Sequence, residues 1–158
     1  MNIKSKLKRL AILEGFNSIF FIVVYFIIIK ILDTQFTLVV FYPLLCCSII
    51  LLQATVYWTI CLKRIDTKSS CICSFRIKYV YRFFRLLNFV LLLMYVLVFF
   101  LSQKTIVESF IGLGIFVFAV IEHINYFYIR LSYPIVELIV RLKKRMLAKS
   151  RIAKEIDD

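Results

Sequence analysis

The sequence predicts an all-α integral membrane protein with four transmembrane helices, arranged as two antiparallel hairpins with both termini in the cytoplasm, and a C-terminal amphipathic cytoplasmic helix. The 158-residue chain is 63% hydrophobic, which is more apolar surface than a soluble domain of this size buries. Four long apolar stretches divide it. Each approaches the ~20 residues that a helix needs to cross a hydrocarbon core of about 30 Å. These observations disfavour a soluble helical bundle.

The four predicted spans cover about 12–32, 36–62, 84–103 and 107–130, within a single membrane domain over 1–158. Runs such as Phe89–Leu93 are apolar on every side, whereas the strands of a membrane barrel alternate apolar and polar residues. Helices also satisfy their own backbone hydrogen bonds in lipid. The first span follows a basic N-terminus, as a secretory signal does, but no small-residue cleavage site follows it. We therefore expect an uncleaved first helix.

The distribution of basic residues predicts the orientation. Of the 21 Lys and Arg residues, only Lys30 and Lys104 lie in the two connections that would share the outer side. The positive-inside rule then places both termini and the loop 63–83 in the cytoplasm, in a multi-pass protein of the cell membrane. Because topology accounts for the net charge of +12, nucleic acid is not an expected partner. The expected partners are instead anionic lipid head groups on the cytoplasmic face.

A basic amphipathic helix is predicted over 134–150. Apolar residues recur at helical spacing from Ile135 to Met146, and Pro134 suits a first helical turn. Such a helix lies along lipid head groups or docks on a partner. The residues from Ala153 to Asp158 are expected to be frayed. The predicted lipid or partner surface of this helix consists of Arg141, Lys143, Lys144 and Arg145.

Polar residues inside the spans lie at one level, roughly 9–15 Å from the cytoplasmic end at about 1.5 Å per residue. Polar groups at equal depth on neighbouring helices can satisfy one another, whereas groups that face lipid cannot. We expect Arg85 or Arg82 to approach Glu122. This layer is interpreted as a belt that fixes helix pairing, as a cytoplasm-facing cavity that binds a ligand, ion or proton, or as lipid-facing residues that snorkel to the membrane surface. Its candidate binding residues are Glu14, Asn17, Gln53, Arg85, Asn88, Glu122, His123, Asn125 and Tyr126.

Catalytic and metal chemistry find little support in the sequence. His123 is the single histidine, so a zinc or di-iron centre lacks ligands. Glu122 and His123 are adjacent, which on a helix points them about 100° apart. The five cysteines form no disulfide framework and are expected to be free thiols. We predict no catalytic residues, no metal and no cofactor, and expect that the protein is not an enzyme.

The sequence favours a small membrane protein that acts by binding, as an accessory subunit or as a protective, immunity-type protein. The immunity-type role rests only on analogy with other small, basic membrane proteins. The alternative is a small oligomeric transporter or an ion or proton pathway around Glu122. Loss of flux on Glu122→Gln substitution would distinguish this alternative. A membrane-protein partner and a homo-oligomer both remain open. Abundant Ile, Phe and Lys with sparse Gly are typical of an AT-rich, bacterial genome.

Overall fold

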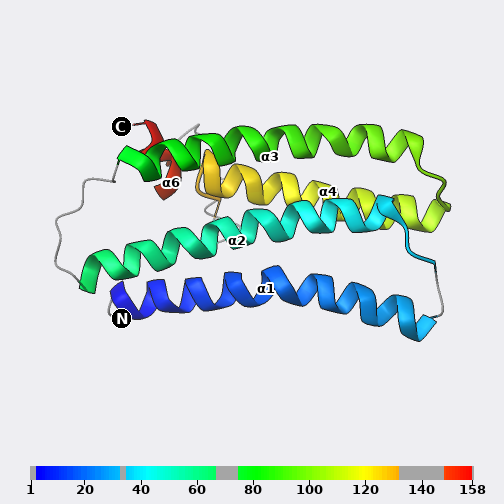
Figure 1. Ribbon diagram of the computed structural model, residues 1–158, viewed down its shortest axis with the longest axis horizontal. Helices are drawn as coiled ribbons and strands as arrows, with labels where there is room; N and C mark the ends of the chain where they lie inside the picture. The colour runs from blue at the N-terminus through cyan, green and yellow to red at the C-terminus, as the bar shows by residue number, and fades with distance from the viewer. Residues whose placement is uncertain (1–2, 33–34, 67–74, 132–147, 158) are drawn as a thin grey trace.

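A computed structural model describes residues 3–32, 35–66, 75–131 and 148–157. Four long helices lie side by side in a bundle, and a short helix covers one end of it (Figure 1). Each long helix is long and apolar enough to cross a membrane. The prediction of an all-helical protein with four candidate membrane spans is therefore confirmed. Across the described ranges the helices are α1 (Ile3–Leu32), α2 (Leu38–Asp66), α3 (Phe75–Leu101), α4 (Ile106–Phe127) and α6 (Arg151–Asp157).

The helices extend past the predicted spans at the end of the bundle where α6 lies. α1 begins at Ile3, α2 continues to Asp66, and α3 begins at Phe75. All of the described residues in the segment 63–83, which was predicted as a loop, are therefore helical. Hydropathy indicates where apolar character ends, but Lys and Arg are good helix formers whose long stems lie along apolar surface. A basic stretch therefore does not end a helix.

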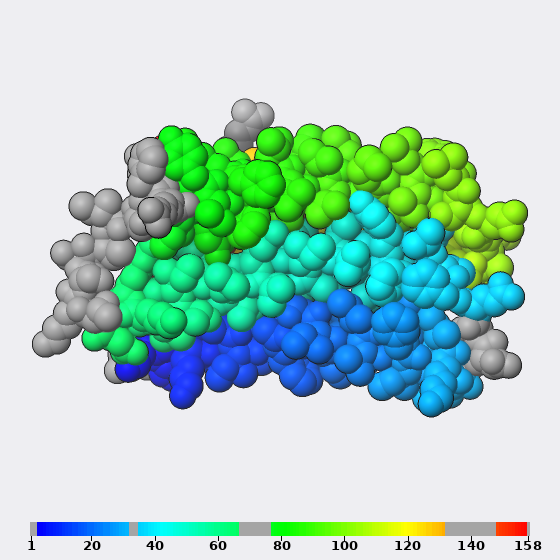
Figure 2. Space-filling model, in the orientation of Figure 1, coloured from blue at the N-terminus to red at the C-terminus, as the bar shows by residue number. Residues whose placement is uncertain are grey.

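Helix α2 occupies the centre of the bundle. It contacts α1, α3 and α4, and side chains such as Ile50, Ala54 and Tyr57 are almost completely buried along it. In the space-filling view α1, α2 and α3 cover the face shown and almost hide α4 (Figure 2). Large apolar side chains remain exposed along α1, α3 and α4. This arrangement, with exposed apolar residues outside and a buried central helix, is what a membrane bundle requires.

Helix α4 begins at a capping box and approaches its neighbours at a glycine. The Thr105 hydroxyl accepts a hydrogen bond from the Glu108 backbone N–H, and the Glu108 carboxylate accepts one from the Thr105 N–H. These bonds satisfy donors that a helix start leaves unpaired. At Gly112, an added Cβ would lie 2.5 Å from the Val39 carbonyl oxygen and 2.8 Å from the Tyr95 hydroxyl. The absence of a side chain there allows α4 to pack against α2.

The C-terminal segment differs from its prediction. Most of the predicted helix 134–150, including Arg141, Lys143, Lys144 and Arg145, lies outside the described residues. Ala148 to Ser150 are not helical, and Lys149 forms an isolated β-bridge with Ile129. The predicted helix therefore does not extend to residue 150. The expectation of frayed residues after Ala153 was wrong, because α6 forms there and buries Ile152, Ala153 and Ile156.

Polar contacts fix α6 to the ends of α2 and α3. The Arg82 guanidinium donates to the Ile156 carbonyl oxygen from Nε at 3.2 Å and from Nη2 at 2.9 Å. Arg64 Nη1 lies 3.1 Å from Glu155 Oε1, and Arg85 Nη1 lies 3.3 Å from Asp157 Oδ1. The expectation that Arg85 or Arg82 approaches Glu122 was wrong. Sequence spacing could not show that α6 folds back and supplies their acceptors.

The docking of α6 is expected to weaken in acid. A hydrogen bond from Lys149 and, secondarily, one from Arg85 hold the pKa of Asp157 below its ordinary value. A carboxyl whose pKa is lowered by folding stabilises the folded state above its unfolded pKa of ~3.9, and loses that contribution as the pH falls through the folded pKa. Trp58 and Ile152 line one cavity, so the emission of Trp58, the single tryptophan, should report undocking. Asp157→Asn should reduce the change in Trp58 emission below pH 4. An unchanged pH dependence of this emission would exclude Asp157 as its source.

Candidate functional site

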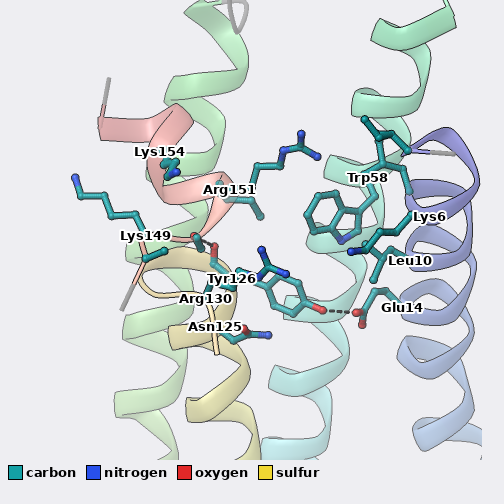
Figure 3. Close-up of a pocket in the computed structure, with 15 residues that line it drawn as sticks. Lys6, Leu10, Glu14, Trp58, Asn125, Tyr126, Arg130, Lys149, Arg151 and Lys154 are labelled. Atoms are coloured by element: carbon teal, nitrogen blue, oxygen red, sulfur yellow. Dashed lines mark hydrogen bonds between the residues drawn. The ribbon is translucent and has the colours of Figure 1, made fainter. Parts of the chain in front are cut away.

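A cavity of about 600 Å³ lies between the beginning of α1, the end of α4 and the segment that enters α6 (Figure 3). Trp58 of α2 contributes to its wall. The cavity therefore brings together residues from both ends of the sequence. This size falls within the range of ~300–1,000 Å³ in which proteins hold small organic ligands.

One face of α1 lines the cavity. Its lining residues recur every three or four positions, which is the spacing of neighbours on one helix face. Three of these residues are apolar, and Trp58 and Ile152 add apolar surface from α2 and α6. The α1 residues that line the cavity are Ile3, Lys6, Leu7, Leu10 and Glu14.

The cavity is strongly cationic. Figure 3 shows Lys6 from α1 and Arg151 from α6 reaching in from opposite sides, while Lys149 points away. Lys149 Nζ pairs with Asp157 Oδ2 at 2.9 Å. Glu14 is the one acidic residue in the described lining. Clefts lined by charge of one sign concentrate ligands of the opposite sign, because their walls have a low dielectric constant. The basic residues of the lining are Lys6, Arg130, Lys149, Arg151 and Lys154.

Part of the predicted polar layer lies at the inner side of this cavity. The Tyr126 hydroxyl donates a hydrogen bond to Glu14 Oε1, which links α4 to α1 (Figure 3). Asn125 Oδ1 accepts from the Leu131 backbone N–H at 2.9 Å. Asn125 Nδ2 also lies 3.4 Å from Glu122 Oε2, a long hydrogen bond. The structure thus brings Glu14, Glu122, Asn125 and Tyr126 together, and all but Glu122 line the cavity.

A second part of the layer forms a separate pair between α2 and α3. Asn88 Nδ2 donates to Gln53 Oε1 at 2.6 Å, and Gln53 Nε2 donates to Asn88 Oδ1 at 3.2 Å. Tyr81 donates to the Gln53 carbonyl oxygen at 2.9 Å. Both amide side chains are buried and neither lines the cavity. Gln53 and Asn88 therefore fix helix pairing and do not offer free groups to a ligand.

The remaining predicted site residues lie apart from the cavity. His123 is 4% exposed and packs against Phe127, with 5.2 Å between ring centroids. Its two ring nitrogens have no hydrogen-bond partner among the described residues. Arg85 stacks over the Tyr128 ring at 5.5 Å, in addition to its pairing with Asp157. Asn17 is half-buried and joins neither polar group described above.

Comparison of the chain with protein-family models, curated proteins and solved structures found no match. Lysine and arginine donate hydrogen bonds and carry positive charge, and arginine binds carboxylate or phosphate with two parallel bonds. Next to these cations lie an apolar part of the cavity wall and the hydrogen-bonded carboxyl of Glu14. This combination suits an anion that also has an apolar body.

Sequence reasoning missed the cationic half of the site. The positive-inside rule already explains the charges of Lys6 and Arg151, and no sequence pattern assigns a role to Trp58. One usable signal was present, since Lys6 and Glu14 lie eight residues apart, on one face of α1. Arg130 similarly follows Tyr126 by four residues. No local signal shows that Arg151 returns to α1.

Proposed function

We propose that this chain is a multi-pass protein of the cell membrane, built as two antiparallel hairpins with both termini in the cytoplasm. The asymmetric distribution of Lys and Arg supports this orientation. The path of the chain is consistent with it, since α1 and α2 lie side by side and run in opposite directions (Figure 1). Lys4 at the start of α1 lies 2.6 Å from Asp66 at the end of α2. In this orientation the cavity lies at the cytoplasmic end of the bundle.

We further propose that the protein acts by binding, as an accessory subunit or a protective membrane protein, and that the cationic cavity is its binding site. The observation that carries this proposal is the convergence of Lys6, Arg130 and Arg151 on a cavity of about 600 Å³. Cations gathered in one cleft attract an anion and can bind it with charge-assisted hydrogen bonds.

A proton or cation pathway is the second candidate function. The observation that favours it is the presence of two acids within the helices, Glu122 and Glu14, each hydrogen-bonded to a residue that lines the cavity. Tyr126 and Asn125 connect these two acids to the cavity. Ionisable groups inside a membrane bundle often mark an ion or proton path. The binding function is preferred because the surrounding wall is cationic and would repel a cation.

The test compares two double variants that lose the same charge. Lys6→Gln/Arg151→Gln removes two cations of the cavity, whereas Lys8→Gln/Arg9→Gln removes two exposed cations of α1 that do not line it. The protein and its variants are extracted gently from the membrane and analysed by native mass spectrometry. We expect the wild type and the Lys8/Arg9 variant to retain a bound species that the Lys6/Arg151 variant loses.

Two outcomes would contradict the binding proposal. A species retained equally by both variants would show that the cavity is not its site. A homo-oligomer that carries no bound species would favour the pathway around Glu122. A bound protein would identify an accessory or protective role, since that partner would depend on the cavity.

A further inference from the structure

We propose that the cavity binds the head group of a lipid that ends in a phosphate monoester. This inference rests on the proposed binding function and names the chemical class of the ligand. It follows from three features of the cavity: the number and type of its cations, the apolar surface beside them, and its size. Each feature excludes a different group of alternative ligands.

The cations match the charge of a phosphate monoester. Lys6 and Arg151 face each other across the cavity and have no ion-pair partner among the described residues. Arg130 also lines the cavity, and the Glu14 carboxyl of its lining is already hydrogen-bonded to Tyr126. A phosphate monoester carries about −1.5 to −2 charges near pH 7, whereas the diester of an ordinary phospholipid carries one. Two cations that face each other without an ion-pair partner in the described part of the chain therefore favour the doubly charged monoester.

The side chains also suit the shape of the charged group. The arginine guanidinium is a planar fork that binds two phosphate oxygens, and the lysine ammonium is a compact point charge. Arg151 approaches from α6 and Lys6 from α1, so a phosphate between them would be held from opposite sides (Figure 3). Trp58 Nε1 is a buried donor without a hydrogen-bond partner in the described part of the chain. Its indole lies between these two cations in the view of Figure 3.

The apolar surface and the volume indicate a lipid instead of a free anion. Leu7, Leu10 and Trp58 line the cavity beside its cations. A space of about 600 Å³ is suited to a ligand with an organic body. Indole rings with one apolar and one polar edge are favoured where lipid head groups meet hydrocarbon. A glycerol backbone and the first acyl carbons would fill the space that a phosphate group alone leaves empty.

The experiment measures ligand binding to the purified full chain in neutral detergent, with Trp58 emission as the signal. The probes are dioleoyl phosphatidate, dioleoyl phosphatidylglycerol with the same acyl chains, and inorganic phosphate. We expect phosphatidate to bind at least about tenfold more tightly than phosphatidylglycerol, since an additional charged hydrogen bond is worth about that factor. Inorganic phosphate should bind much more weakly than either lipid.

The matched variants locate the site. Lys6→Gln/Arg151→Gln should weaken phosphatidate binding by at least about tenfold, while Lys8→Gln/Arg9→Gln should leave it unchanged. Lys6→Arg should retain binding, because it keeps the charge. Size-exclusion profiles of the unliganded variants show whether each remains folded. The comparison of probes on the wild type tests the inference even if a variant misfolds.

Each contrary outcome has a distinct meaning. Equal affinity for phosphatidate and phosphatidylglycerol would contradict the preference for a phosphate monoester. If inorganic phosphate bound as tightly as phosphatidate, the proposal that the ligand is a lipid would be wrong. If phosphatidate does not bind to the cavity, but a copurifying protein still does, this inference is overturned and the proposed function stands. Equal losses in the Lys6/Arg151 and Lys8/Arg9 variants would overturn both, because general surface charge would then explain the binding.

Discussion

Replacement of Gly112 by alanine is expected to destabilise the bundle by about 1–3 kcal/mol, the usual cost of overpacking a close contact. The added Cβ would lie 2.5 Å from the Val39 carbonyl oxygen. Because this oxygen belongs to the backbone of α2, the contact can be relieved only if α2 and α4 move apart. Interfaces between membrane helices depend on such close approaches. The free energy of unfolding, measured by titration with sodium dodecyl sulfate in mixed micelles, should fall accordingly.

Gly114 provides the matched control two residues further along the same helix. A Cβ added there would meet nothing within 4 Å. Gly114→Ala should therefore leave the free energy of unfolding unchanged or raise it slightly, because alanine is the better helix former. Equal stability of the Gly112 and Gly114 variants would show that α2 and α4 do not meet as described.

A second large loss of stability is expected when Asn88 is substituted. Substitution of Asn88 by leucine would remove both hydrogen bonds of the reciprocal pair and leave the buried Gln53 amide without a side-chain partner. An unsatisfied buried polar group costs about 1–3 kcal/mol in proteins, whereas membrane hydrogen bonds average about 0.6 kcal/mol. Because Asn88 is only 1% exposed and water cannot replace it, we expect a loss of about 1–2 kcal/mol.

A double-mutant cycle separates the interaction energy of the Gln53–Asn88 pair from the cost of changed packing. Gln53→Met/Asn88→Leu replaces both amides by apolar side chains of similar size. This double variant should recover most of the stability that Asn88→Leu loses, since no unpaired amide remains. Additive losses in the same unfolding titration would indicate that the two amides do not interact. The cavity should be unaffected in the single variants Gln53→Met and Asn88→Leu and in the double variant, because neither residue lines it.

The presence of four long apolar helices followed from sequence, because each helix depends on local properties. Apolar length predicted the helices themselves. Depth along each helix predicted one polar layer, and the structure joins Gln53 to Asn88 and Glu14 to Tyr126 within it. In both cases the physical reason is that a polar group in a membrane seeks a partner at its own level.

The cationic half of the cavity did not follow from sequence because it depends on tertiary contacts. Arg151 reaches the cavity only because α6 docks on the bundle through Ile152, Ile156 and their polar neighbours. A seven-residue helix is too short to be stable alone, so no local pattern predicts it. Lys6 presented a different difficulty, since the orientation rule alone already accounted for its charge.

The hydrogen bond between Glu14 and Tyr126 has a mechanical consequence for the bundle. Among the described helices, α1 packs extensively only against α2, and this bond ties it to α4. A membrane hydrogen bond is worth about 0.6 kcal/mol on average, close to the thermal energy of ~0.6 kcal/mol at room temperature. Loss of the Glu14–Tyr126 bond would therefore remove a direct link between α1 and the opposite wall of the cavity, and would leave α1 held mainly by its packing against α2.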